Sequence, residues 1–430
     1  MQNSLIPLLI SLFLLPQPLS SVQAEVDSPV TSKSSGSYFS GNYISLFASL
    51  LGKNEKEIQA KIEKAFNQLF HGKNGTERVY YPVEPDMAYV MDILNNDVRS
   101  EGMSYGMMIA VQLDRKSEFD RIWKWAKTYM QHHTGIRKNY FAWHCTTAGA
   151  KLDQNAASDG EEWFVTALFF AAARWGNGEG IFNYKEEAQT ILRTMIHKES
   201  EAGNDGTITN MFHKKEHQVV FVPSIEAAGF TDPSYHLPHF YELWGRWARS
   251  DNDFWCKAAA TSRQFLKKAV HPATGLAPDY ANFDGSPVDP WKGGHSDFRF
   301  DAWRVAMNVA VDHSWFGKDP WAVTQSNRLL SFFFSQGIGT YGNNFTLEGK
   351  RLSIDHSPGL VAMNAVACLA ATHEKRKEFL EELWNAPVPS GPARYYDGLL
   401  YMMALLQVSG NFRIYHPNGV LVPACPDGSQ

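Results

Sequence analysis

The sequence predicts an all-α fold, an (α/α)6 barrel built from six inner and six outer helices. Helical periodicity dominates the chain after residue 42. The predicted helices alternate between amphipathic segments, such as NEKEIQAKIEKAFNQLF, and segments that are apolar nearly all round, such as DGLLYMMALL. No fixed-period repeat is visible in the sequence, which favours a closed barrel over an open solenoid of stacked hairpins.

Each helix follows from its own pattern of charge. The outer helices carry charge on one face, whereas inner segments such as EWFVTALFFAAARW and GLVAMNAVACLAA are expected to be buried on most sides. Short strands such as HQVVFV and TLEGKRLSI are expected in the connections. In chain order, the predicted helices span about 54–71, 100–113, 117–132, 159–175, 183–198, 233–249, 252–270, 298–315, 319–337, 356–373, 374–385 and 395–409.

The first residues, MQNSLIPLLISLFLLPQPLSSVQA, predict a secretory signal peptide over 1–24. An apolar centre is followed there by two prolines and by the small-residue cleavage sequence VQA. That centre is too short to span a bilayer, and no later stretch reaches spanning length. We therefore expect an exported protein, periplasmic or secreted, with a flexible mature N-terminus over 25–41 and a single domain over 42–430.

The composition excludes several partner classes. The net charge is −5 and no Lys/Arg tract stands out, which argues against nucleic-acid and anionic-membrane partners. The four cysteines, Cys145, Cys256, Cys368 and Cys425, are widely spaced without a C-x-x-C pair, so we expect no metal site and no cofactor. Two disulfides and buried free thiols both remain open. We expect a monomer.

Acidic residues stand at the heads of three predicted inner helices. Glu101 follows Ser100, a capping residue type, and opens a helix with no other Asp, Glu, Lys or Arg as far as Leu113. Asp159 heads the second inner helix, and Asp301 lies near the head of the fourth. A single acid at a helix head is usually a cap. Three acids on parallel apolar helices instead predict a site at one shared mouth.

Such a mouth suits hydrolysis of a glycosidic bond, which needs two carboxyl groups in different protonation states. Apolar methionines follow Glu101, and Asp159 is expected close to it, so the pKa of Glu101 is predicted to be raised. Two arginines, Arg299 and Arg304, flank Asp301 and favour its ionised form. The pattern therefore predicts a general acid and a general base.

Four long motifs occur in order along the chain: DVRSEGMSYGMMIAVQ, ASDGEEWFVTALFFAAARW, FRFDAWRVAMN and RYYDGLLYMMALL. They resemble glycoside hydrolase family 8, and the resemblance covers about residues 42–410. It implies an (α/α)6 barrel and an inverting enzyme, with Glu101 as the general acid and Asp301 as the general base. It implies that Asp159 binds the distorted sugar. Inversion implies that the two catalytic carboxyl groups lie about 6.5–9.5 Å apart.

The segments YFAWHC, DPSYHLPHFYELW and GLAPDYANFDG most resemble the xylan-acting branch, and within it the reducing-end xylose-releasing exo-oligoxylanases. The expected substrate is a xylo-oligosaccharide or xylan. By the same resemblance, His356 belongs to a loop that blocks the cleft beyond one reducing-end sugar. Ser357 departs from the usual neighbours of that histidine, and the export signal departs from the usual intracellular setting. An endo-β-1,4-xylanase acting on polymeric xylan remains an alternative.

Further side chains are expected to bind substrate. Trp143, Tyr235 and Tyr396 are candidate sugar platforms, with core packing as the alternative for each. Arg99, two residues before the acid, either binds sugar or forms a structural salt bridge. The residues alone also allow a noncatalytic carbohydrate-binding protein, a polysaccharide lyase or a sugar epimerase.

Overall fold

The computed structural model describes residues 36–417 together with Met1 and Cys425. The signal peptide expected over 1–24 lies outside these residues, as does most of the segment expected over 25–41. Within the described residues, the chain forms fourteen α-helices and two small antiparallel sheets. The expected helical character is confirmed.

Six helices are buried nearly all round because their sequences are mainly apolar, and the few charged side chains on them are mostly buried and paired. Helix α4 packs beside α6 and α14, α12 packs beside α14, and α10 packs beside α8 and α12. Side chains join α6 to α8, where the rings of Trp163 and Phe240 lie 4.8 Å apart. These helices are α4 (Ser100–Gln112), α6 (Ser158–Trp175), α8 (Pro238–Trp247), α10 (Arg304–Phe316), α12 (Pro358–Ala367) and α14 (Arg394–Val408).

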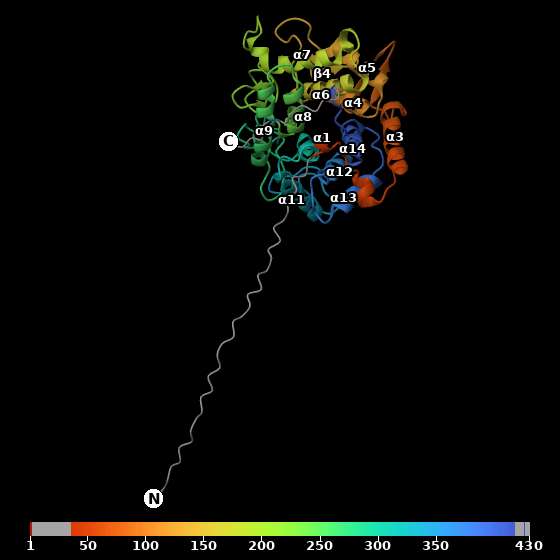
Figure 1. Cartoon of the computed structure of the whole chain (residues 1–430), viewed down its shortest axis with the longest axis vertical. Helices are drawn as coiled ribbons and strands as arrows, with labels where there is room; N and C mark the ends of the chain where they lie inside the picture. Colours follow the sequence, from red (N-terminus) through yellow and green to blue (C-terminus); the bar gives the residue numbers. More distant parts are fainter. Residues whose placement is uncertain (2–35, 418–424, 426–430) are drawn as a thin grey trace. The chain divides into compact units, whose positions relative to one another are not determined.

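Six amphipathic helices cover these buried ones. In chain order they pack against α14, α4, α6, α8, α10 and α12, and they surround the labelled buried helices in Figure 1. The first begins at a capping box formed by Asn54 and Glu57, which satisfies backbone N–H groups of its first turn. These helices are α3 (Glu55–His71), α5 (Lys116–Trp125), α7 (Tyr184–His197), α9 (Asn252–Ala269), α11 (Trp321–Gln336) and α13 (Arg376–Asn385).

Two short helices, α1 (Ser37–Ser40) and α2 (Leu46–Leu51), precede them and were not predicted. The expectation of a flexible segment is wrong for residues 36–41. Tyr38 is buried there and its ring stacks on Phe316 at 5.2 Å. Burial of an aromatic ring stabilises this short segment against α10. The packed part of the chain therefore begins before residue 42.

Two predicted helices are broken near their heads. A 3₁₀ turn, Pro233–Tyr235, precedes α8, which begins at Pro238 because proline suits the first turn of a helix. A second 3₁₀ turn, Phe300–Trp303, precedes α10 and carries Asp301. Both turns stand at the end of the molecule where the acids gather.

A five-stranded antiparallel sheet, which the sequence analysis did not predict, supports the head of α4. Its strands, in spatial order, are β1 (Tyr80–Val83), β2 (Met87–Asp92), β3 (Asp97–Arg99), β4 (His144–Thr146) and β5 (Lys151–Asp153). Strand β3 leads directly into α4, and β4 pairs with it so that Arg99 is opposite His144. A second sheet pairs β6 (Phe212–His213) with β7 (Gln218–Val219), so HQVVFV is only partly a strand. The segment TLEGKRLSI contributes one bridge residue, Arg351.

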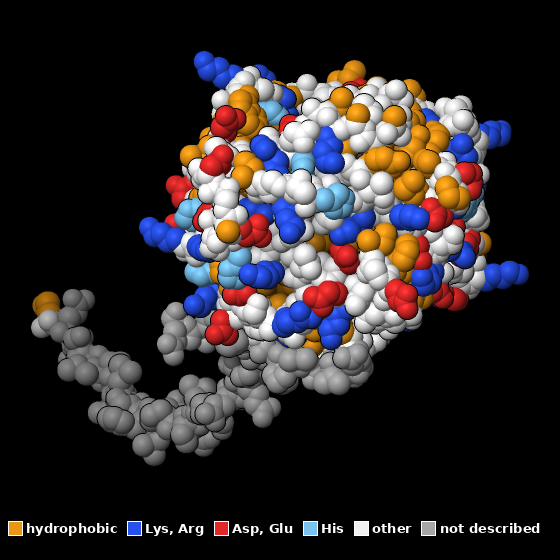
Figure 2. All heavy atoms as spheres, turned by 90° about the horizontal axis from the view of Figure 1, so that it is seen from above, with side chains coloured by type: hydrophobic (Ala, Val, Ile, Leu, Met, Phe, Trp, Pro, Cys, Tyr) orange, Lys and Arg blue, Asp and Glu red, His pale blue; other side chains and the backbone are white. Residues whose placement is uncertain are grey.

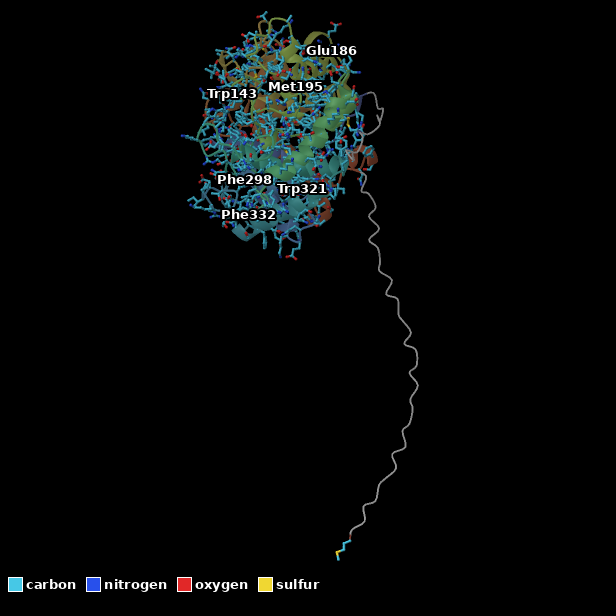
Figure 3. All side chains as sticks on the ribbon, turned by 90° about the vertical axis from the view of Figure 1, so that its left-hand side faces the viewer. Trp143, Glu186, Met195, Phe298, Trp321 and Phe332 are labelled. Atoms are coloured by element: carbon cyan, nitrogen blue, oxygen red, sulfur yellow. A yellow bond between two sulfur atoms is a disulfide. The ribbon has the colours of Figure 1, made fainter. Side chains whose placement is uncertain are left out.

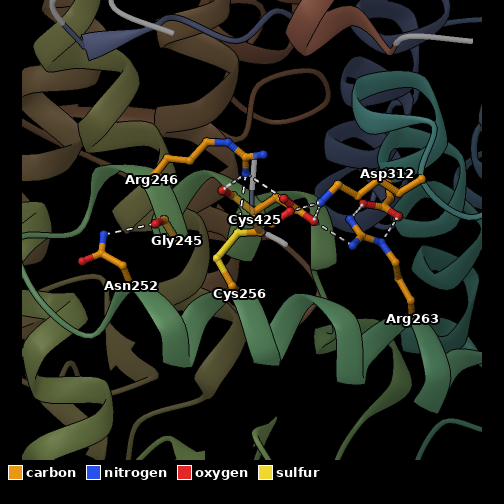
Figure 4. Close-up of polar contacts among 9 residues, drawn as sticks. Gly245, Arg246, Asn252, Cys256, Arg263, Asp312 and Cys425 are labelled. Carbon is orange, nitrogen blue, oxygen red and sulfur yellow. Dashed lines mark hydrogen bonds and ion pairs between the residues drawn. A yellow bond between two sulfur atoms is a disulfide. The ribbon is translucent and has the colours of Figure 1, made fainter. Parts of the chain in front are cut away.

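Cys256 and Cys425 form a disulfide, while Cys145 and Cys368 are buried free thiols. Figure 4 shows the disulfide beside a network of buried charges. Arg263 donates to Glu242 at 2.8 Å and pairs with Asp312 at 2.7 Å. The disulfide ties Cys425 to α9, and Arg246 of α8 contacts the Cys425 sulfur at 3.8 Å.

Charged side chains of both signs are interspersed over the face shown in Figure 2. The described residues contain no helix that combines the length and the apolar character needed to cross a membrane.

Candidate active site

Arg304, the first residue of α10, connects three acids from three different elements. Its Nη1 lies 2.8 Å from Glu101 Oε2 and 3.0 Å from Asp159 Oδ2. Its Nη2 lies 3.0 Å from Asp301 Oδ1. The guanidinium side chain is only 2% exposed, so this is a buried cluster of one cation and three carboxyl groups. The structure therefore brings Glu101, Asp159 and Asp301 together.

Glu101 lies in the first turn of α4 but does not cap it. The sequence suggested Ser100 as a helix cap, but Ser100 is itself the first helical residue. Arg99 occupies the N-cap position, and its side chain makes no hydrogen bond to the first turn of α4. Tyr395 donates its hydroxyl to Glu101 Oε1 at 3.0 Å. Burial, together with the charges of Asp159 and Asp301, raises the pKa of Glu101 to about 7 against the opposing charge of Arg304.

The other two acids differ in their surroundings. Asp159 is buried in the first turn of α6, and burial raises the pKa of its carboxyl group although Arg304 opposes the shift. Asp301 is the more accessible, with 29% of its side chain exposed against 17% for Glu101. Asp159 is thus shielded from water, while Asp301 is accessible to it.

These acids line a cavity of about 460 Å³. One wall comes from the α4 head and the β4–β5 segment, and the opposite wall comes from the connections before α8 and before α10. The lining residues are Arg99, Ser100, Glu101, Trp143, Asp153, Asn155, Ala157, Asp159, Phe221, Val222, Ser224, Glu226, Ala227, Tyr235, Tyr280, Trp291, Asp301 and Arg304.

Three of the predicted binding residues line this cavity. Trp143 comes from the segment just before β4, and Figure 3 shows it near the surface of the molecule. Arg99 lies over the Trp143 ring at 5.6 Å, and it also pairs with Asp97 at 3.1 Å. Arg99 therefore has the salt bridge that the sequence left open as well as a place at the cavity. The buried Tyr235 ring lies 5.6 Å from the Arg304 guanidinium carbon.

Two predicted residues are not among those that line the cavity. Tyr396 donates its hydroxyl to the carbonyl of Phe300 at 2.8 Å, whereas its neighbour Tyr395 contacts the acid. His356 Nδ1 lies 2.8 Å from the Tyr341 carbonyl, and its Nε2 lies 2.9 Å from Glu382 Oε1. The hydrogen bond to Glu382 raises the pKa of His356, which favours the imidazolium that donates from both nitrogens.

Sequence reasoning missed several residues of the site. It placed Arg304 beside Asp301 but did not foresee that one guanidinium reaches all three acids. Ser234, whose Oγ accepts from Arg304 Nη2 at 2.9 Å, and Tyr395 carry no pattern that separates them from packing residues. Glu226, Tyr280 and Trp291 lie in connections, where periodicity gives no signal. In the described part of the chain, no three His, Cys, Asp or Glu side chains are grouped to hold a metal ion.

The arrangement suits acid–base chemistry on an acetal. A carboxyl group with a pKa of about 7 is protonated in about half of the molecules at neutral pH, and the protonated form can give its proton to a leaving oxygen. A second, more exposed carboxylate can take a proton from an attacking water molecule. The two groups contact different nitrogens of Arg304, Glu101 at Nη1 and Asp301 at Nη2, and both line the same cavity.

Comparisons with known proteins agree with this geometry. A model of the family described as glycosyl hydrolases family 8 matches residues 92–410. The reducing-end xylose-releasing exo-oligoxylanase Rex8A of Paenibacillus barcinonensis is 47% identical over 88% of this chain and 98% of its own length. The reducing end xylose-releasing exo-oligoxylanase of Halalkalibacterium halodurans is 43% identical over 89% of this chain and 97% of its own.

Solved structures extend the agreement to the fold. The crystal structure of a GH8 xylobiose complex from Teredinibacter turnerae is 49% identical, with a TM-score of 0.85 over 88% of this chain and all of that one. Rex8A complexed with xylose has a TM-score of 0.84 at 46% identity, over 89% of this chain and all of that one. Motifs, acid cluster, family match and fold agree: this chain belongs to family 8 of the glycosyl hydrolases.

Proposed function

We propose that this protein is an inverting glycoside hydrolase that cleaves β-1,4-xylosidic bonds and releases xylose from the reducing end of xylo-oligosaccharides. The proposal rests on the Arg304 cluster. Glu101 and Asp301 both line one cavity there, but the Asp301 side chain is more exposed to water than that of Glu101. Three relatives, 47%, 43% and 36% identical, bear names that state this activity.

In this proposal Glu101 is the general acid and Asp301 is the general base. Glu101 protonates the leaving oxygen while Asp301 takes a proton from water on the opposite face of the sugar, which inverts the anomeric centre. Asp159 binds the distorted sugar and keeps the pKa of Glu101 high. Trp143 and Tyr235 form the walls against which sugar rings pack.

We also infer that the inner helices close into an (α/α)6 barrel. Packing from α4 to α6, from α8 through α10 and α12 to α14, and from α14 back to α4 supports a closed ring. The ring contacts and hydrogen bond between α6 and α8 support the remaining step, since Trp244 Nε1 donates to Thr166 Oγ1 at 3.0 Å. A crystal structure with an open row of helices would contradict this.

His356 anchors the loop over residues 352–357 through its hydrogen bonds to Tyr341 and Glu382. This loop is joined to the catalytic region because Asn343 accepts from Trp303 Nε1 at 3.0 Å and donates to Ser357 Oγ at 2.8 Å. Ile354, an apolar residue, is 84% exposed on the loop. We propose that the loop closes the cleft beyond one reducing-end sugar and that His356 holds it in place.

A second candidate is an endo-β-1,4-xylanase acting on polymeric xylan. It is favoured by the ring of His356, which bonds Glu382 and Tyr341 rather than facing the cavity. A 49% identical solved structure is that of a xylanase from Teredinibacter turnerae in complex with xylohexaose.

A time course on xylotriose and longer chains labelled at the reducing end separates the two candidates. Early release of labelled xylose alone is the expected result. A spread of labelled fragments, together with a fall in xylan viscosity, would replace the first candidate by the second. Cleavage of glucan or chitosan without cleavage of xylose chains would overturn the substrate in both.

We further propose that the protein is exported, to the periplasm or the medium. The N-terminal sequence and the Cys256–Cys425 disulfide support this, because structural disulfides persist mainly in oxidising compartments. Cell fractionation with sequencing of the mature N-terminus tests it. We expect a mature chain that begins at Glu25, and full-length protein in the cytosol would contradict export.

A further inference from the structure

We propose that Trp291 is a sugar-binding platform at the outer end of the cleft, where it binds a xylose unit remote from the bond that is cut. This inference rests on the proposed function and adds a residue that determines which chain lengths are preferred. Trp291 comes from the connection between α9 and α10, and it lines the same cavity as the catalytic acids.

The exposure of Trp291 is unusual for so large an apolar side chain. It is 56% exposed, while most of the other tryptophans in the described residues are buried in the core. An exposed indole ring offers a large apolar surface that a ligand can cover. Its position at a cavity that contains a carboxylate cluster indicates a ligand with both apolar faces and hydroxyl groups.

Trp291 is the exposed member of a group of packed rings. Phe221, Phe230, Tyr280 and His295 contact it at interplanar angles of 53°, 73°, 89° and 89°, so in the described part of the chain every ring contact of Trp291 is tilted or edge-on. Phe221 stacks on Phe230 at 5.1 Å, and Tyr280 stacks on His295 at 4.2 Å. These four neighbours are buried or half-buried, so Trp291 is the ring of this group with the most surface open to a ligand.

A row of rings leads from the catalytic centre to Trp291. Tyr235 lies over Arg304, Phe221 stacks on Tyr235 at 5.8 Å, and Trp291 contacts Phe221 at 5.7 Å. Two rings, Tyr235 and Phe221, therefore separate Trp291 from Arg304, and we place another sugar of the same chain at Trp291. A chain cut one unit from its reducing end extends all its remaining units to one side, and this row provides a wall for them.

The loop that carries Trp291 is held in a defined conformation. The carboxylate of Asp289 accepts from the backbone N–H groups of Gly293 at 2.9 Å and Gly294 at 2.7 Å. Arg299 donates to the Gly293 carbonyl at 2.8 Å. Gly294 has a φ of +85°, which a side chain would strain. A platform fixed before binding spares the entropy of ordering it.

The ring chemistry of Trp291 fits xylose. A β-xylopyranose ring carries no hydroxymethyl group, and its hydroxyl groups are equatorial, so both faces present C–H bonds to an aromatic ring. Glu226 lines the same cavity and offers a carboxylate to the equatorial hydroxyl groups.

The test compares Trp291→Ala, Trp291→Phe and a control, Phe334→Ala, which removes an exposed aromatic ring on α11 that does not line the cavity. Circular dichroism melting first establishes that each variant is folded. We then expect the ratio of kcat/KM for xylohexaose to that for xylotriose to fall about tenfold in Trp291→Ala, through KM. Trp291→Phe should restore most of the ratio, and Phe334→Ala should leave it at the wild-type value.

Calorimetric titration provides a readout that needs no turnover. In a Glu101→Gln background, Trp291→Ala should weaken xylohexaose binding about tenfold. If Trp291→Ala changed neither the ratio of kcat/KM values nor the Kd for xylohexaose, the platform would be overturned. An equal loss of kcat/KM for all chain lengths would also overturn it, because that result indicates a role in the loop alone. Failure of the wild-type enzyme to cleave any xylo-oligosaccharide would instead overturn the proposed function.

Discussion

Arg304 Nη1 lies 2.8 Å from Glu101 Oε2 inside the protein, so the proposed general acid is held by a buried cation. A cation alone would favour an ionised glutamate and remove the proton that catalysis needs. Burial and the charges of Asp159 and Asp301 outweigh Arg304 and leave the pKa of Glu101 at about 7. Arg304 can therefore orient Glu101 without depriving it of its proton.

Arg304→Lys should reduce kcat about a hundredfold while the protein stays folded. Lysine keeps the charge but replaces a planar fork by a single ammonium group, which cannot reach three acids at once. The acids would then shift, and displacement of catalytic groups by about 1 Å costs rates of this order. Kinetics on xylotriose, with melting curves as the check on folding, measure the effect. Wild-type kcat in this variant would show that the bridging geometry is dispensable.

The pH dependence should report Glu101. Its protonated form is the active one, so kcat/KM should fall as pH rises through about 7. Asp159 raises the pKa of Glu101, so Asp159→Asn should move the alkaline limb to lower pH whatever the residual activity. The full pH profile of both enzymes is the measurement. An alkaline limb that stays in place in Asp159→Asn would mean that another group sets it.

Glu101→Gln should strongly reduce turnover and preserve binding. General acid catalysis contributes about 10²–10⁴-fold in rate, whereas the amide has nearly the shape of the acid and keeps an oxygen for Arg304. We expect kcat to drop within that range, with a xylotriose Kd within a few-fold of the wild-type KM. If the wild-type protein binds xylotriose without cleaving it, the protein is instead a noncatalytic carbohydrate-binding protein.

The sequence predicted the parts of this site that lie on regular helices. Glu101 and Asp159 could be located because each heads an apolar helix whose period is visible along the chain. Whether Tyr395 or Tyr396 faces the acids depends on the position of α14 to within one residue. Predicted helix ends are uncertain by more than one residue, so the sequence could not decide between the two. The β1–β5 sheet was missed because its strands have three to six residues, too few for a clear alternation. Trp291 lies in a connection without periodicity. Its position at the cavity depends on packing against rings that are distant in sequence, which the sequence pattern does not reveal.

The anchor of the loop over residues 352–357 can be tested through the products. His356→Ala removes both hydrogen bonds of the ring, and Glu382→Gln removes the charge that holds it. If the loop closes the cleft, both variants should release labelled fragments longer than xylose from labelled xylohexaose, because a loosened loop admits further reducing-end sugars. Thr346→Ala, a change in the same connection before α12 but away from the anchor, is the control. Xylose as the sole labelled product in both variants would contradict this role of the loop.

The disulfide should stabilise the protein without affecting catalysis. It joins residues 169 positions apart and lies beside the C-terminal part of α8, whereas the acids lie at helix heads. Closing so long a loop restricts the unfolded chain, and we expect Cys425→Ser to lower the free energy of unfolding by about 2–4 kcal/mol. At 25 °C its kcat on xylotriose should equal that of the wild type. Reductant should lower the melting temperature of the wild type and leave that of the variant unchanged, and a wild type insensitive to reductant would contradict the stabilising role.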